Sequence, residues 1–178
     1  MLRVTHKRSV DISRFEANLF GIILPMGLRV ERVHITGADA TVIHEPFSAT
    51  LEDPGRLEVF VKQEDIAGFL NQTAPAGLKN VTVEAMAGFL HVRATKTVII
   101  DVKAYVVCSL RIVGESKLFV DLESVDVMGV GTKQLMQSQI DKINPIIDTT
   151  DFPVASKLET VEVVEGGILL RGRISPPA

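Results

Sequence analysis

The stretch TVIIDVKAYVVCSLRIV, residues 97–113, carries the clearest β-strand signal in this chain. Every second residue from Val98 to Ile112 is small or apolar, whereas the opposite face also carries charged and polar side chains. A period of two is typical of a strand that buries one face. After a turn at residues 114–116, a second alternating run from Leu118 to Leu122 predicts the antiparallel partner. Such a long hairpin would twist, so that its apolar face forms the wall of a trough.

Three further segments have apolar residues at helical spacing and predict amphipathic helices. The first begins at Asp11 or Ser13 as N-cap and ends before Pro25, the second spans about residues 63–71, and the third is capped by Thr132. Their apolar stripes are Ile12, Phe15, Leu19, Phe20 and Ile23; Ile66, Phe69 and Leu70; and Met136, Ile140, Ile143 and Ile147.

Each predicted helix precedes a proline-marked turn and a predicted β-hairpin, which indicates three copies of one unit. The prolines are Pro25, Pro75 and Pro145, and the hairpin turns are expected at Gly37, Gly88 and Gly166. Units that cannot bury their apolar faces alone stack into one core. We therefore expect an elongated α+β fold with repeated helix-plus-hairpin units, in which about three amphipathic helices cover the apolar face of a long, twisted, mainly antiparallel β-sheet. Residues 1–178 are expected to form a single domain.

The composition argues against several classes of function. The 178 residues are 46% hydrophobic and only 5% aromatic, with no Trp, and the net charge is −3. A nucleic-acid partner is not expected, because phosphate binding and base stacking require excess basic and aromatic residues. No apolar run reaches the ~20 residues that a membrane-spanning helix needs.

Catalytic and metal-binding patterns are also missing from the sequence. The four histidines are scattered, without the helical spacing of a zinc hydrolase. Asp121 and Glu123 alternate on a strand face that we expect to be solvated, where charges keep a sheet soluble. Cys108 is the only cysteine and has apolar neighbours, so we expect a buried, unreactive thiol. The sequence predicts no catalytic residue, no metal site and no cofactor.

Two stretches resemble a known family. In the first, residues 57–71, LEVFVKQEDIAGFLN, a predicted strand passes directly into a predicted helix. The second runs from Ile143-Asn144-Pro145 to Gly172 and includes the last predicted hairpin. Both resemble elements of the LmeA-like phospholipid-binding family, a group of bacterial domains, and the resemblance extends over most of the chain from about Leu28. It implies a non-enzymatic lipid-binding protein with an elongated body of sheet and helices.

Location is less directly predicted. Proteins of that family are often exported or membrane-anchored, whereas the start of this sequence has basic residues but no apolar signal-peptide core. The sequence as given predicts a cytoplasmic location, or the cell envelope if a leader has been removed.

A trough lined by aliphatic side chains suits a flexible acyl chain, whose binding depends on the apolar area removed from water. We therefore predict non-catalytic binding of a phospholipid or similar amphiphile between sheet and helices, linked through the resemblance to envelope lipid handling. The candidate lipid-binding residues are Phe15, Leu19, Ile23, Phe69, Leu70, Val102, Val106, Leu110, Met136, Ile140 and Ile143.

Two alternatives remain open from the residues alone. The same side chains could fill a closed core in a structural or protein-interaction module, which would form a homo-oligomer through an exposed edge of the long hairpin. The basic residues Arg3, Lys7, Arg8 and Arg14, next to the first apolar stripe, could bring the first helix to an anionic membrane surface as a peripheral contact. A packed helix with solvated basic side chains is the simpler explanation of that cluster.

Overall fold

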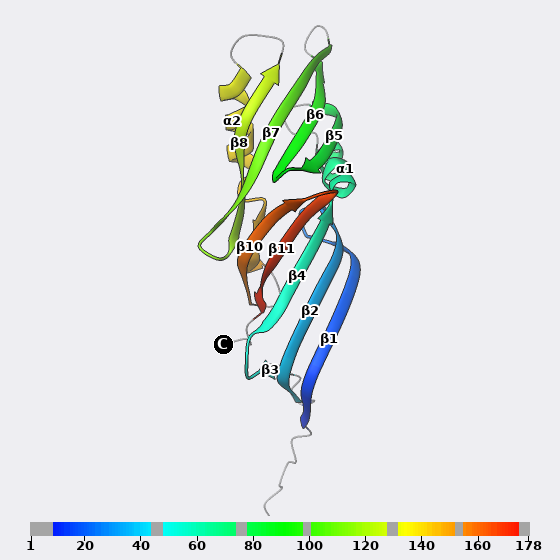
Figure 1. The fold of residues 1–178 in the computed structure, drawn as a ribbon, viewed down its shortest axis with the longest axis vertical. Coiled ribbons are helices and arrows are strands. Elements are labelled where there is room, and N and C mark those ends of the chain that lie inside the picture. The colour runs from blue at the N-terminus through cyan, green and yellow to red at the C-terminus, as the bar shows by residue number, and fades with distance from the viewer. Residues whose placement is uncertain are drawn as a thin grey trace, which may run out of the picture.

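The computed structural model describes residues 9–43, 48–73, 78–97, 101–127, 132–151 and 155–174. These residues form two antiparallel sheets and two short α-helices (Figure 1). The molecule is elongated, with one sheet in each half of its long axis (Figure 1).

The first sheet contains the two ends of the described chain. Its strands have the order β1–β2–β4–β11–β10, and a short strand, β3, pairs with the end of β2. Their bounds are β1 (Ser9–Ile23), β2 (Arg29–Ile43), β3 (Ser48–Leu51), β4 (Gly55–Lys62), β10 (Ser156–Val164) and β11 (Gly167–Ile174).

The second sheet is built from the middle of the chain and includes the hairpin predicted from residues 97–123. Its order is β5–β6–β7–β8–β9. The strands are β5 (Leu78–Met86), β6 (Phe89–Thr97), β7 (Asp101–Val113), β8 (Lys117–Val127) and the two-residue β9 (Ile147–Asp148). The predicted β7–β8 hairpin is confirmed, with its turn at Gly114–Ser116, while residues 98–100 lie outside the described part of the chain.

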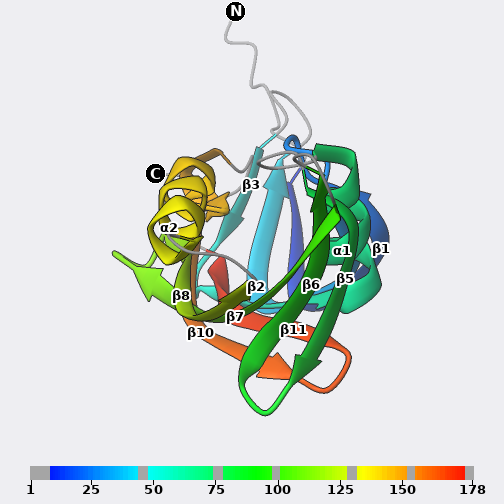
Figure 2. The same cartoon turned by 90° about the horizontal axis from the view of Figure 1, so that it is seen from above.

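Helix α1 (Gln63–Thr73) connects the two sheets, whereas α2 (Thr132–Ile143) connects two strands of the second sheet, and the helices pack at opposite edges of that sheet. Helix α1 follows β4 without a break and leads to β5, and α2 lies between β8 and β9. A short 3-10 helix at Thr149–Asp151 leads to β10. Seen along the long axis, α1 and α2 flank β6, β7 and β8 (Figure 2). The predicted second helix is therefore confirmed. The third is confirmed as far as Ile143, whereas Ile147, predicted on the same helical stripe, lies on β9.

One hydrophobic cluster contains buried residues from both sheets and both helices. Its largest fully buried side chains are Leu118 on β8, Val30 on β2 and Val61 on β4. Backbone hydrogen bonds also join the sheets, from Leu158 to Glu115 and from Gly166 to Ala85. The core thus lies where the two sheets meet, beneath the helices.

The predicted first helix is wrong, because residues 9–23 form β1. This strand pairs with β2 along its whole length, so its backbone groups are satisfied by a neighbour rather than within a helical turn. Asp11 caps no helix, and its carboxylate accepts a hydrogen bond from the Thr41 hydroxyl at 2.8 Å. The spacing of the apolar residues from Ile12 to Ile23 is compatible with both a helix and a strand, and the pairing with β2 makes the segment a strand.

Gly37 marks no hairpin turn, which is a second correction. It lies in the middle of the continuous strand β2, opposite Phe15 on β1. A Cβ atom at Gly37 would lie 2.4 Å from the Phe15 ring, so the missing side chain makes room for that ring.

The fold class as predicted is therefore wrong. The described chain is mostly β, with two sheets instead of one and two short helices instead of about three. The predicted helix-plus-hairpin unit occurs at α1–β5–β6. It occurs again at α2–β10–β11, with β9 and a 3-10 helix between α2 and β10. The first predicted copy is a hairpin without a helix.

Candidate functional site

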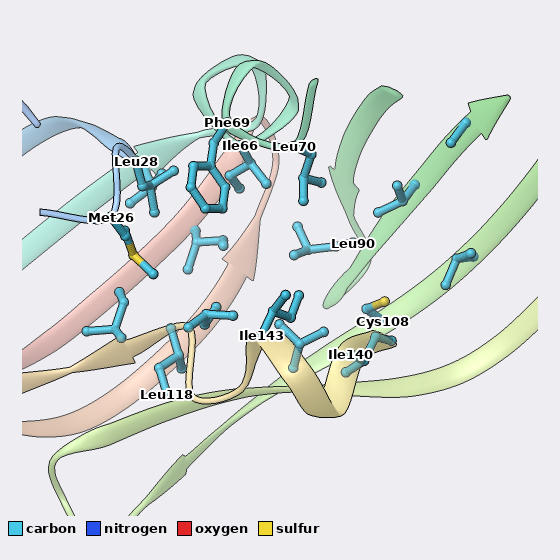
Figure 3. Close-up of a pocket in the computed structure, with 18 of the residues that line it drawn as sticks. Met26, Leu28, Ile66, Phe69, Leu70, Leu90, Cys108, Leu118, Ile140 and Ile143 are labelled. Carbon is cyan, nitrogen blue, oxygen red and sulfur yellow. The ribbon is translucent and has the colours of Figure 1, made fainter. Parts of the chain in front are cut away.

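An apolar cavity lies between the two helices, the strands below them and the β1–β2 turn (Figure 3). Its volume is about 140 Å³. All of the described residues that line it are apolar, and none is charged. A space of this kind stays free of ordered water, because water needs polar partners.

The strands supply the walls of the cavity through their alternation. The second sheet contributes Leu90, Ala94, Ala104, Val106, Cys108 and Leu118 among others. Side chains at every second position face the same side, so positions 104, 106 and 108 of β7 all reach the cavity. The first sheet contributes Val61 from β4 with Ile168 and Leu170 from β11. Both sheets therefore contribute to one site.

The helices cover the cavity with side chains spaced by one turn. Ile66, Phe69 and Leu70 point down from α1, and Ile140 and Ile143 point in from α2 (Figure 3). Residues three and four positions apart share one face of a helix, which explains both sets. The cavity thus has a helix on each side.

Each helix is held to the second sheet by an asparagine near its C-terminal end. The Asn71 side chain donates to the Val81 carbonyl at 2.8 Å and accepts from the Val81 N–H at 2.8 Å. Asn144, immediately after α2, bonds both backbone groups of Val120 in the same way, at 2.8 and 2.9 Å. We call Asn71 and Asn144 the amide clamps. They replace a missing strand partner and fix the helices over the cavity.

The cavity reaches the surface between the β1–β2 turn and α2. Met26 and Ile143 both line it, and they remain 42% and 38% exposed. The turn is fixed by two backbone hydrogen bonds, from Leu24 to Leu28 and from Gly27 to Leu24. Gly27 has a φ of 98°, a conformation that disfavours other residues. We call the space between Met26 and Ile143 the mouth.

A family model described as LmeA-like phospholipid-binding matches residues 12–173, nearly the whole chain. The chain belongs to the LmeA-like phospholipid-binding family. This confirms the resemblance seen in the sequence. No curated protein and no solved structure matches the chain.

The predicted lipid-binding residues of this LmeA-like chain fall into four groups. Five of them line the cavity, namely Phe69, Leu70, Val106, Ile140 and Ile143. Leu110 packs against the core cluster, outside the cavity lining. The side chains of Val102 and Met136 lie outside the described part of the structure.

The remaining three predicted residues, all on β1, are not brought to the cavity. Phe15 covers Gly37, while Leu19 and Ile23 are 46% and 70% exposed. They were chosen as members of a helical stripe. Because the segment is a strand, that stripe does not exist.

Sequence reasoning missed the part of the cavity that comes from the turn and from the first sheet. Val61, Ile168 and Leu170 lie in apolar stretches of the sequence, but nothing in the chain linked them to the distant second sheet. Met26 carried no periodic signal, since it lies in a turn.

No metal or ionic chemistry is apparent at the site. Within the described ranges, no group of three His, Cys, Asp or Glu side chains could hold a metal ion. Neither helix in those ranges has the length and apolar character needed to cross a membrane. His34, one of the scattered histidines, contacts Glu16 on β1 at 3.1 Å.

The cavity also controls the chemistry of Cys108. Burial raises the pKa of this thiol from its ordinary 9.0 to about 12, and the carboxylates of Glu123 and Asp121 add to the effect. The thiol is therefore neutral and behaves as a small apolar side chain.

We expect Cys108 to react with a water-soluble disulfide reagent at pH 8 at least about a hundredfold more slowly than in the unfolded chain, because little thiolate is present. The rate is measured by absorbance in buffer and in concentrated urea. Similar rates in the two solvents would show that the cavity admits water and the reagent.

Proposed function

We propose that this protein binds a phospholipid or a similar amphiphile without catalysis, and that part of an acyl chain occupies the cavity. The observation that carries the proposal is the entirely apolar described lining of a cavity that reaches the surface beside Met26 and Ile143. Placing a hydrocarbon chain there removes apolar area from water without burying a polar group. Membership of a family described as phospholipid-binding supports the phospholipid as ligand.

The volume limits how much of the lipid enters. A protein cavity of roughly 150 Å³ lined by Leu, Ile and Phe accommodates benzene, so the present 140 Å³ holds about six carbon atoms. A longer part of the chain would require α1 and α2 to move apart. The polar head group would remain in water outside Met26 and Ile143, because the described lining offers it no polar partner.

A role in envelope lipid handling is part of this proposal, since members of the family that the sequence resembles are often exported or membrane-anchored. A closed-core interaction module is supported less well. Such a module needs a filled interior, as protein cores have few voids larger than a water molecule.

Native mass spectrometry of the purified chain, followed by organic extraction, tests the proposal. We expect a species heavier by the mass of one phospholipid, and the extract should contain that lipid. The chain stripped of lipid should also take up a phospholipid with a fluorescent acyl chain. A chain that remains bare in both experiments would contradict the proposal.

A further inference from the structure

Three exposed apolar side chains lie around the β1–β2 turn. Phe20 and Ile23 are 69% and 70% exposed, and Met26 is 42% exposed. We call these three residues the hairpin tip. Leu28 and Val30, which follow directly, are buried at 7% and 2%, so the backbone that carries the tip is firmly packed. Phe20 and Ile23 lie opposite Arg32 and Arg29 in the pairing with β2, so they project from opposite faces of the hairpin, and the end of the hairpin is apolar on both faces. Large exposed apolar side chains on a well-packed element indicate an interaction site.

The hairpin tip is continuous with the mouth of the cavity. Met26 belongs to both, and in Figure 3 it extends from the turn toward the side of the cavity where α2 and Ile143 lie. A hydrocarbon chain that leaves the cavity between these residues would therefore pass directly along the tip. This continuity links the occupant of the tip to the ligand of the cavity.

The charges next to the tip are compensated. Arg29 Nη1 lies 3.0 Å from Asp65 on α1 and 2.8 Å from Glu31, and Lys62 Nζ lies 2.9 Å from Glu31. Two cations thus face two carboxylates, and no net negative charge repels an anionic surface. Lys142, the neighbour of Ile143, is exposed and makes no ion pair within the described residues.

The area argues against a second copy of the chain as the occupant. The three side chains of the tip expose on the order of 350 Å² together, less than half of the roughly 800 Å² that each partner of a stable complex buries. A lipid interface needs no such area, because a few inserted apolar side chains and a nearby cation suffice for reversible binding.

We propose that the hairpin tip inserts into the interfacial layer of a phospholipid bilayer and places the mouth against the membrane. The inference rests on the proposed function, and it supplies the route by which a lipid enters. An acyl chain can then pass from bilayer to cavity along Phe20 and Met26 without crossing water.

The absence of Trp from the sequence allows a direct test. In Phe20→Trp the only indole lies on the tip, and we expect its emission to shift to the blue when vesicles of phosphatidylcholine and phosphatidylglycerol are added. The matched control is Phe89→Trp, which places the indole at the β5–β6 turn. Phe89 is also exposed, at 39%, but does not line the cavity. Its emission should not change.

A loss-of-binding variant completes the test. Because each side chain inserted contributes roughly tenfold to the partition coefficient, Phe20→Ser combined with Ile23→Ser should weaken vesicle binding at least tenfold. Both side chains are exposed, so the fold should persist, as thermal unfolding would verify. Uptake of a short-chain phospholipid supplied as monomer should equal that of the wild type, because neither residue lines the cavity.

Unchanged vesicle binding in the double variant, or equal blue shifts in both Trp variants, would overturn the membrane assignment. A concentration-dependent dimer that the double variant abolishes would assign the tip to a second copy instead. The experiments distinguish failure of the membrane-docking proposal from failure of the proposed lipid binding. A chain that binds vesicles through the tip but takes up no monomeric lipid would support the docking surface and contradict lipid binding in the cavity.

Discussion

Ala104→Leu is expected to prevent lipid uptake while leaving the lipid-free protein at least as stable as the wild type. Ala104 lines the cavity, is 6% exposed and lies opposite Ala94 across the β6–β7 pair. A leucine side chain would extend into the 140 Å³ of empty space. Filling a cavity commonly adds about 0.5–2 kcal/mol to the free energy of unfolding. Uptake of the fluorescent phospholipid should fall at least tenfold, since the acyl chain loses that space.

The matched control is Ala85→Leu. Ala85 is buried at 2% on β5 of the same sheet, but it does not line the cavity. The larger side chain has no space there, and we expect it to lower the free energy of unfolding by about 1–3 kcal/mol. Lipid uptake per folded molecule should be unchanged. Both quantities are measured by urea unfolding and by titration with the fluorescent lipid. Equal destabilisation in the two variants would mean that the cavity is ordinary filled core.

Asn144→Ala is expected to lower the free energy of unfolding by about 2 kcal/mol and to loosen the end of α2. The substitution removes two hydrogen bonds to Val120, each worth about 1 kcal/mol, and leaves partly buried backbone groups without partners. Hydrogen exchange at the Val120 amide should accelerate, because this amide donates to the side-chain Oδ1 of Asn144. Lipid affinity should also fall, since Ile140 and Ile143 on α2 line the cavity.

Two variants provide the comparison for the amide clamps. Asn71→Ala removes the equivalent pair of bonds from α1 to Val81 and should have an effect of similar size. Asn18→Ala removes only one contact, to the exposed Glu16 side chain at 3.3 Å, and should change stability by less than about 0.5 kcal/mol. If Asn144→Ala behaved like Asn18→Ala and left Val120 exchange unchanged, the amide clamps would have no role in holding the helices.

Local sequence patterns predicted the elements in which the spacing of the buried residues fits only one kind of secondary structure. Residues 104–112 alternate because β7 buries one face, and the stripe of Ile66, Phe69 and Leu70 defined α1. The segment from Ile12 to Ile23 was misread because its apolar residues fit a helix as well as a strand. Only the pairing partner, β2, distinguishes the two, and it lies in a different part of the chain.

The residues of the candidate site were likewise predictable only where a local pattern in the sequence marked them. Phe69, Leu70, Val106, Ile140 and Ile143 were predicted to face one apolar space, and they do line one cavity. Their neighbours from the first sheet and from the β1–β2 turn could not be predicted, because contacts between sheets leave no period in the sequence.

The sequence by itself determined that the chain is rich in aliphatic residues, that it belongs to the LmeA-like phospholipid-binding family and that α1 and α2 have apolar faces, because composition and periodicity are local properties. It did not determine that the fold is mostly β. Only the tertiary structure decided that there are two sheets, that a cavity remains between them, and that it opens beside Met26. Cavities and mouths depend on how distant segments pack, since an unfilled volume belongs to no residue in particular.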